Sequence, residues 1–173
     1  ESLLTYHQTR SRNRVAAQNA ETQMLSNLHR LGEAYRQAGD WGAAIKAYER
    51  GVAIIKAGLK SYTEGDLYHG LGQAYLGKKD FVKSEENLKK ALAVADAQQQ
   101  ISMAQSTSST MGDLFVQSQR PSEAIPHYRK AIEIVESARS LLQSEEFRGS
   151  FFQGKQDTYG GMILAQLEVK NQE

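Results

Sequence analysis

The sequence predicts an all-α fold of antiparallel helix pairs that repeats every 40 residues and ends in a capping helix. The period is visible in Gly32, Gly72 and Gly112, whose two spacings are both 40 residues (72 − 32 and 112 − 72). Around each glycine, apolar residues recur at intervals of three and four, which is the spacing of one face of an α-helix. Such phased copies are typical of solenoids, in which stacked units bury one continuous core.

Each copy is expected to contain two helices joined by a short polar break. The copies are expected over residues 21–60, 61–100 and 101–143, with an extended second helix in the last copy. Residues 1–20 are expected to form the last helix of a partial preceding repeat, and residues 144–173 a capping helix and linker. The apolar positions of the first copy are Leu25, Leu28, Leu31, Tyr35, Ala44, Ile45, Tyr48, Val52 and Ile55.

The polar breaks carry signals for the starts and ends of helices. Asp40 and Asp80 are placed to accept hydrogen bonds from free amides in the first turn of the following helix. The third copy lacks such a cap, and there Pro121 is expected to start the helix instead, because its fixed φ suits the first helical position. Pro126 falls beyond the first turn, so we expect a bend or a lost backbone hydrogen bond there. Gly77 is expected to cap the helix before the second break.

The three repeat glycines are best explained by close packing. Glycine inside a helix costs about 1 kcal/mol relative to alanine, so we expect the paired helix to approach each one closely. Gly72, Gly77 and Lys78 also resemble part of a phosphate-binding loop. That motif needs a preceding strand and a following Ser or Thr, whereas here a helix precedes and Lys79 follows. We therefore expect no nucleotide and no other cofactor.

Composition argues against several kinds of partner. The 21 basic and 20 acidic side chains give a formal net charge of +1, so we expect no nucleic-acid partner. Purely apolar runs are only a few residues long, so we expect no membrane partner. The absence of cysteine excludes disulfides, thiolate metal sites and cysteine nucleophiles. Because the chain begins at Glu1 without a signal segment, we expect a piece of a longer, cytoplasmic protein.

The histidines invite a metal hypothesis. His29 and His69 each lie three residues before a repeat glycine, where Glu33 or Asp66 could complete a site. The third copy has Ser109 at this position, and no histidine or cysteine stands at ligand spacing from the pair. We predict solvated groove histidines and no metal. Without a serine-nucleophile motif or a distinctive acid–base pair, we also predict no enzyme activity.

The repeating residues resemble the tetratricopeptide repeat family over residues 21–135. The period of 40 differs from the 34 residues of the standard repeat. The resemblance implies a right-handed superhelix whose concave groove binds a protein or peptide. The residues that carry it in the first copy are Leu31, Gly32, Tyr35, Ala44, Tyr48 and Gly51.

The resemblance also implies which first-helix positions face the groove. These positions are polar and mixed in sign, and they lack the lysine–asparagine clamp with which some members grip a C-terminal carboxylate. The predicted groove residues are Ser26, His29, Glu33, Arg36, Gln37, Asp66, His69, Gln73, Leu76, Ser106, Ser109, Asp113, Val116 and Gln117.

The tail after the repeats has two readings. Its apolar residues fall near one helical stripe, as expected of a helix that covers the open end of a solenoid: Phe147, Phe151, Tyr159, Met162, Ile163 and Leu167. The tail is also similar to the segment that joins tetratricopeptide repeats to a CHAT domain, a caspase-like peptidase domain common in bacterial and especially cyanobacterial repeat proteins. The residues that carry this similarity are Ser144, Glu145, Glu146, Arg148, Ser150, Phe151, Lys155, Asp157 and Tyr159.

Three functions remain open from the sequence. The first is a scaffold that binds a partner in the groove. The second, implied by the tail, is the sensing arm of a CHAT-type peptidase that follows in the same chain. The third is self-association into a homo-oligomer, with the first helix or the tail docking on another copy.

Overall fold

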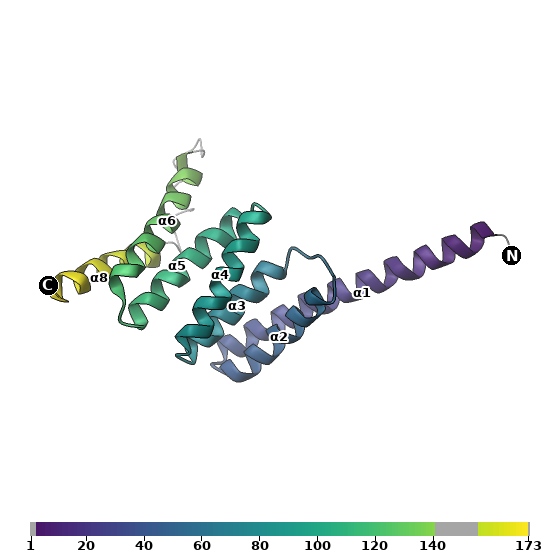
Figure 1. Ribbon diagram of the computed structural model, residues 1–173, viewed down its shortest axis with the longest axis horizontal. Coiled ribbons are helices and arrows are strands. Elements are labelled where there is room, and N and C mark those ends of the chain that lie inside the picture. Colours follow the sequence, from purple (N-terminus) through teal and green to yellow (C-terminus); the bar gives the residue numbers. More distant parts are fainter. Residues whose placement is uncertain (1–2, 141–155, 173) are drawn as a thin grey trace.

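The computed structural model describes residues 3–140 and 156–172. Within these residues the chain forms helices and no strand, which confirms the all-α helical-repeat fold. Figure 1 shows the helices stacked side by side, with the first half of α1 projecting from the stack. The helices are α1 (Leu3–Gln37), α2 (Trp41–Lys56), α3 (Glu64–Gly77), α4 (Phe81–Ala97), α5 (Ile101–Gln117), α6 (Pro121–Ser140) and α8 (Gln156–Gln172).

The helices form three pairs, α1–α2, α3–α4 and α5–α6, followed by α8. The first helix of each later pair packs against its own partner and against the second helix of the preceding pair. It also touches the first helix of the preceding pair, so the first helices line one side of the stack. The predicted groove residues all lie on α1, α3 and α5, the first helices of the three pairs.

The expected helix starts are confirmed. The Asp40 carboxylate accepts from the Ala43 amide at 2.9 Å, and Asp80 accepts from the Lys83 amide at 3.2 Å. Pro121 is the first residue of α6, and Pro126 lies inside that helix, where it has no amide hydrogen to donate.

The expected role of Gly77 is wrong. The residue with positive φ after α3 is Lys79 (φ 60°), at the position that Gly39 (φ 76°) has in the first pair. Gly77 is instead the last residue of α3 and lies against Trp41, where an added Cβ would be 2.6 Å from Cδ2 of the indole. Gly77 therefore permits a close contact with α2 and does not cap the helix.

Close packing at the repeat glycines is confirmed. The Tyr48 ring lies against Gly32 of its own pair and Gly70 of the next, so that a Cβ on either glycine would overlap the ring. At Gly72, an added Cβ would be 2.5 Å from Leu88 Cδ2. Tyr128 repeats the first arrangement against Gly112, as described with α8 below. Side chains of the second helices therefore fill the space that the missing Cβ atoms leave.

One continuous helix spans residue 20, where we expected a boundary between a partial repeat and the first full copy. Residues 15–22, VAAQNAET, contain no glycine or proline and are rich in helix-forming alanine, so nothing in them ends a helix. Leu31 is 43% exposed, whereas its equivalents Leu71 and Met111 are buried in the core clusters. Leu31 differs because no described helix precedes α1 to cover this side.

Helix α8 takes the place of the first helix in a fourth pair, since it packs on α6 and touches α5. Gly161 lies against Tyr128 as Gly70 lies against Tyr48, and Ala165 is fully buried, like Ala74 four residues after Gly70. These contacts fix an offset of 91 residues (161 − 70) between α3 and α8.

The expected apolar stripe of the tail is partly wrong. Ile163 and Leu167 are more than half exposed, and Leu164 beside them is exposed to the same degree. Tyr159 and Met162 are half-buried, whereas the fully buried positions are Thr158 and Ala165. The two phenylalanines of the stripe, Phe147 and Phe151, lie outside the described residues.

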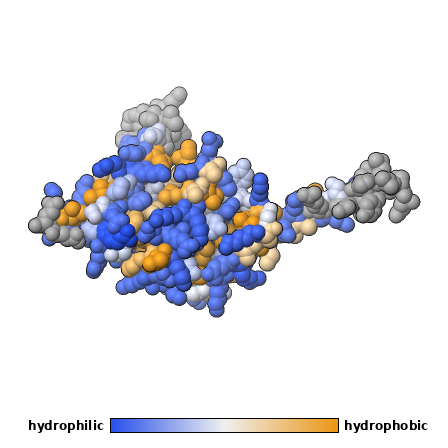
Figure 2. Space-filling model, in the orientation of Figure 1, coloured by the Kyte–Doolittle hydropathy of each residue, from blue (hydrophilic) through white to orange (hydrophobic). Residues whose placement is uncertain are grey.

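Figure 2 shows a largely hydrophilic face with separate apolar patches.

Candidate functional site

Four predicted groove residues from α1 and α3 lie around Tyr48 of α2, and we call this group the Tyr48 site: Glu33, Arg36, Tyr48, Asp66 and His69. Arg36 Nη2 donates to Glu33 Oε2 at 2.8 Å and Arg36 Nε donates to Glu33 Oε1 at 3.2 Å. Tyr48 Oη donates to the same Oε1 at 2.6 Å. One carboxylate thus receives three hydrogen bonds, two of them from a planar guanidinium that matches its geometry.

These bonds control the charge of the cluster. Burial raises the pKa of Glu33, but the hydrogen bonds from Arg36 and Tyr48 and the charge of Arg36 outweigh it and lower the pKa overall. Burial, together with the hydrogen bond to Glu33, raises the pKa of the Tyr48 hydroxyl. Glu33 is therefore ionised and Tyr48 neutral near pH 7, so the guanidinium is held by a full negative charge.

The histidine and aspartate that α3 contributes are more deeply placed. His69 Nε2 lies 3.1 Å from Thr110 Oγ1 of α5, within hydrogen-bond distance. Burial lowers the pKa of His69 to about 4, so its ring is neutral at pH 7. Burial also raises the pKa of Asp66, with Glu33 adding to the rise and His29 opposing it. The His29 ring lies 6.1 Å from the Tyr48 ring.

The structure gives no support to a metal at this cluster. Among residues 3–140 and 156–172, no group of three or more histidine, aspartate or glutamate side chains is arranged to hold a metal ion. His69 directs Nε2 toward the Thr110 hydroxyl instead.

Three predicted groove residues of α5 line a cleft of about 420 Å³ between α5 and α8. Asp113, Val116 and Gln117 come from α5, and Tyr128 of α6 forms part of the wall. We call this the Tyr128 site, and α8 completes it with Asp157, Gly160, Gly161 and Leu164.

Tyr128 Oη donates to Asp113 Oδ1 at 2.7 Å, as Tyr48 does to Glu33. The pKa of Asp113 is raised overall, whereas that of Glu33 is lowered. Burial raises the pKa of Asp113, the hydrogen bond from Tyr128 lowers it, and the charge of Asp157 raises it further. Burial and the bond to Asp113 raise the pKa of the Tyr128 hydroxyl. The Tyr128 site is therefore acidic, with two carboxylates that disfavour each other.

Not all of the remaining predicted groove residues have side chains that are accessible to a partner. Leu76 is only 8% exposed and belongs to the apolar core with Leu88, so its assignment to the groove is not supported. Ser109 Oγ lies 3.0 Å from Thr158 Oγ1 and thus contacts α8. The Ser106 hydroxyl donates to its own helix at Met103 O. The others keep surface access: Ser26 and Gln37 are exposed, and Gln73 is half-buried.

Sequence analysis missed the α8 side of the cleft. The signal was present as DLYHG at residues 66–70 and DTYGG at residues 157–161, which share an aspartate, a tyrosine and a glycine in the same register. The 91-residue offset conceals this similarity, because 91 is not a multiple of the 40-residue period.

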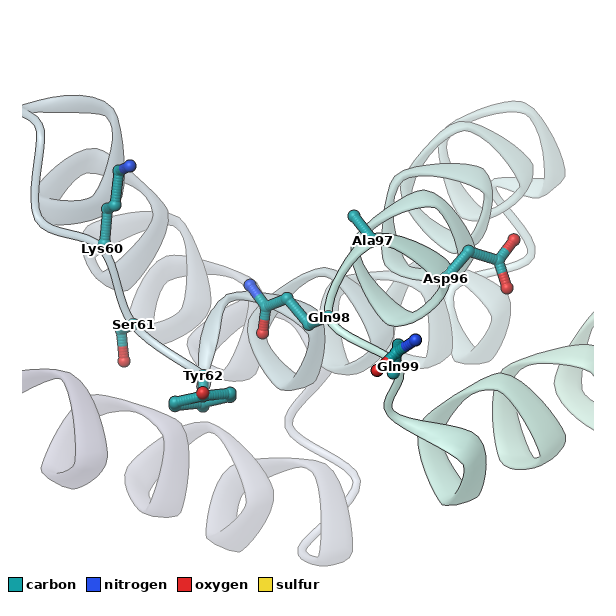
Figure 3. A pocket seen from close by; sticks show the side chains of 7 residues that line it. All are labelled: Lys60, Ser61, Tyr62, Asp96, Ala97, Gln98 and Gln99. Atoms are coloured by element: carbon teal, nitrogen blue, oxygen red, sulfur yellow. The ribbon is translucent and has the colours of Figure 1, made fainter.

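A larger hollow of about 570 Å³ lies elsewhere, between the α2–α3 connection and the α4–α5 turn. Figure 3 shows that its side chains come from these two separate segments and do not converge on one point. Tyr62 at its edge is 79% exposed. Its lining residues Ser61 and Gln98 accept local hydrogen bonds, from the Thr63 amide and from Gln100 Nε2 respectively.

Stacked helix pairs that share one continuous packing define a helical-repeat protein. Residues 23–97, which contain the first two pairs, match the family described as Tetratricopeptide repeat. The third pair and α8 continue the same packing beyond the matched residues. No curated protein matches the chain. Among the described residues, no helix has the length and apolar content needed to cross a membrane.

Proposed function

We propose that the chain is a protein-interaction module that binds a segment of a partner protein on the face formed by α1, α3, α5 and α8. Tetratricopeptide repeats generally mediate protein–protein interaction. The observation that carries the proposal is the convergence of polar side chains from successive first helices at the Tyr48 and Tyr128 sites. No catalytic step is part of this function.

The Tyr48 site is suited to binding because its geometry is set before a partner arrives. Glu33 and Arg36 are each 28% exposed, so a partner can reach them while Tyr48 fixes their position. Fixed side chains lose little conformational entropy on binding, which leaves more of the contact energy as affinity.

The test is capture of partners from a lysate of the source organism by the chain and by a groove variant, Arg36→Glu with His69→Glu. A matched control, Arg50→Glu with Gln166→Glu, makes the same formal charge change at exposed positions of α2 and α8. We expect the groove variant to lose partners that the control retains, with circular dichroism showing that both are folded. Equal recovery of every partner by both variants contradicts binding at the groove.

A second candidate is the sensing arm of a CHAT-type peptidase joined to this chain. It rests on the tail residues, of which Asp157 and Tyr159 lie in the described part. Since α8 packs directly on α6, a peptidase domain joined to α8 is coupled to the repeats. Peptide cleavage by the joined protein that is independent of partner and unchanged by deletion of the repeats excludes this role.

Self-association is a third candidate, favoured by exposed apolar side chains at both ends of the stack. Met24 and Leu31 are exposed on α1, and Ile163, Leu164 and Leu167 are exposed on α8. Sedimentation equilibrium distinguishes the outcomes: rising mass with concentration supports self-association, and a constant monomer mass excludes it.

A further inference from the structure

The cleft of the Tyr128 site has a counterpart within the same chain. Tyr48 lies between Gly32 and Gly70, and Tyr128 lies between Gly112 and Gly161. Each tyrosine hydroxyl donates to the carboxylate that follows the first glycine of its set. The two sites are therefore equivalent, residue by residue, and can be compared directly.

The equivalence extends to the acidic groups. Glu33 corresponds to Asp113, since both accept from the tyrosine hydroxyl. Asp66 corresponds to Asp157, since each lies four residues before the glycine that faces the ring, at Gly70 and Gly161. Each site therefore brings one carboxylate from its own pair and one from the next first helix.

Two of the differences between the sites remove a nitrogen-containing side chain next to the carboxylates. Arg36, three residues after Glu33, corresponds to Val116, three residues after Asp113. His69, which precedes Gly70, corresponds to Gly160, which precedes Gly161. A methyl group at Gly160 would meet no other described atom within 4 Å, so the imidazole is replaced by open space.

The result is a cleft lined by two carboxylates and, among the described residues, by no cation. At the Tyr48 site the positive charge of Arg36 neutralises the Glu33 carboxylate, to which it donates two hydrogen bonds. At the Tyr128 site no described residue forms an ion pair with Asp113 or Asp157. Burial raises the pKa of Asp113, and the negative charge of Asp157 raises it further.

We propose that the Tyr128 site binds an arginine side chain of the partner segment, which takes the place that Arg36 occupies in the Tyr48 site. The guanidinium lies between Asp113 and Asp157, and its aliphatic stem lies against Val116 and Leu164, which line the cleft. A cleft of about 420 Å³ has room for this side chain. The proposal rests on the proposed function and deepens it by naming the chemistry of the bound residue.

Charge complementarity is the basis of this assignment. A planar guanidinium donates to carboxylates in pairs, and the chain uses this pairing between Arg36 and Glu33. Tyr128 fixes Asp113 before binding, so the carboxylate is oriented in advance. Arginine binding also relieves the repulsion between Asp113 and Asp157.

The test is an NMR titration of the ¹⁵N-labelled chain with N-acetyl-arginine amide. N-acetyl-citrulline amide, which has nearly the same shape but no charge, is the control probe. We expect saturable shifts at the amides of Asp113, Gln117, Gly160 and Gly161 with the arginine probe and not with the citrulline probe. Equal shifts with both probes, or shifts at other residues alone, overturn the proposal.

Two variants sharpen the test. Asp157→Asn removes one carboxylate and is expected to weaken binding of the arginine probe about fivefold. The control is Glu133→Gln, which removes an exposed carboxylate outside the cleft and is expected to leave binding unchanged. Val116→Arg supplies an internal arginine at the position of Arg36 and is expected to abolish probe binding and to raise the melting temperature. Unaltered probe binding by Asp157→Asn or by Val116→Arg, in folded protein, overturns the proposal.

The outcome is separable from that of the proposed function. If the groove variant loses partners but the arginine probe does not bind, only the arginine site fails. If the probe binds as expected and the groove variant keeps every partner, the arginine site stands and the wider groove proposal fails.

Discussion

At the residue scale, two tyrosines connect packing to function. The faces of the Tyr48 and Tyr128 rings lie against glycines from two successive first helices, and their hydroxyls orient acidic groups on the binding face. The same side chain therefore sets the distance between helices and the position of a carboxylate. A change at the glycines is expected to disturb both.

Gly70→Ala tests this coupling. The added Cβ would lie 2.5 Å from Tyr48 Cζ, so the ring or the helix must shift, and we expect a loss of about 1–3 kcal/mol in the free energy of unfolding. Urea unfolding measures it. Gly42→Ala is the matched control, because its Cβ would meet only Asp40 Oδ1 at 3.7 Å. We expect the control to gain up to about 1 kcal/mol from helix propensity, and equal losses in both variants would contradict the packing account.

The buried His69 predicts a dependence of stability on pH. Its pKa is lowered from 6.5 to about 4 on folding, so between these values the unfolded state binds more protons than the folded state. The stabilisation from keeping His69 neutral is fully present above pH 6.5 and is lost as the pH falls toward 4. The free energy of unfolding is expected to fall by on the order of 2 kcal/mol over this range. His69→Gln retains a partner for Thr110 but cannot titrate.

Urea midpoints of the chain and of His69→Gln between pH 4 and pH 7 measure this effect. The variant is expected to lose less stability than the parent chain over that range. Parallel pH profiles would show that His69 is not held neutral by burial.

At the element scale, the turns between paired helices rely on local chemistry. Asp40 and Asp80 cap the helices that follow, and a residue with positive φ ends the helix that precedes. Gly39 adopts this conformation without strain, whereas Lys79 adopts it with a Cβ atom, which costs about 1 kcal/mol.

Lys79→Gly is therefore expected to raise the free energy of unfolding by about 0.5–1 kcal/mol, since it removes this strain. Lys78→Gly is the control, because Lys78 has an ordinary φ of −80° and gains nothing from glycine. Thermal unfolding of both variants checks the prediction. Stabilisation by Lys78→Gly equal to that by Lys79→Gly would contradict it.

How much of this structure the sequence predicts depends on the range of the interaction. Caps at Asp40 and Asp80 were predictable because they involve residues three apart. The exposure of Leu31 was not, because the side chain has the same chemistry as buried Leu71 and differs only in lacking a preceding helix. The position of α8 was missed because its register departs from the 40-residue phase that revealed the other helices.

The candidate site is also predictable only in part, because its contacts join residues that are far apart in the sequence. The family resemblance predicts Glu33, Arg36 and Asp113 as groove residues, whereas the repeat pattern predicts only packing for Tyr48. Their hydroxyl contacts depend on how far each ring extends between two helices, which spacing along the chain does not specify.

At the scale of the whole molecule, stability is expected to vary along the stack. Among the described residues, each helix pair packs mainly against its neighbours in the stack. The first half of α1 extends beyond the stack (Figure 1), and the described side chains of residues 11–20 are all exposed. Segments without tertiary contacts open with little free-energy cost.

Hydrogen exchange measures this gradient. We expect the amides of residues 11–20 to exchange orders of magnitude faster than those of residues 44–52, which include the buried core of α2. Equal protection of both segments would mean that α1 is covered in solution, as self-association at this end requires.

The central claim is that partners bind on the face of the first helices. A photo-crosslinking residue is placed either at Gln73, a predicted groove position of α3, or at Lys46, which is exposed on α2. Each protein is then irradiated in a lysate of the source organism. We predict that partner proteins cross-link to position 73 and not to position 46. Cross-links confined to position 46 would contradict the claim.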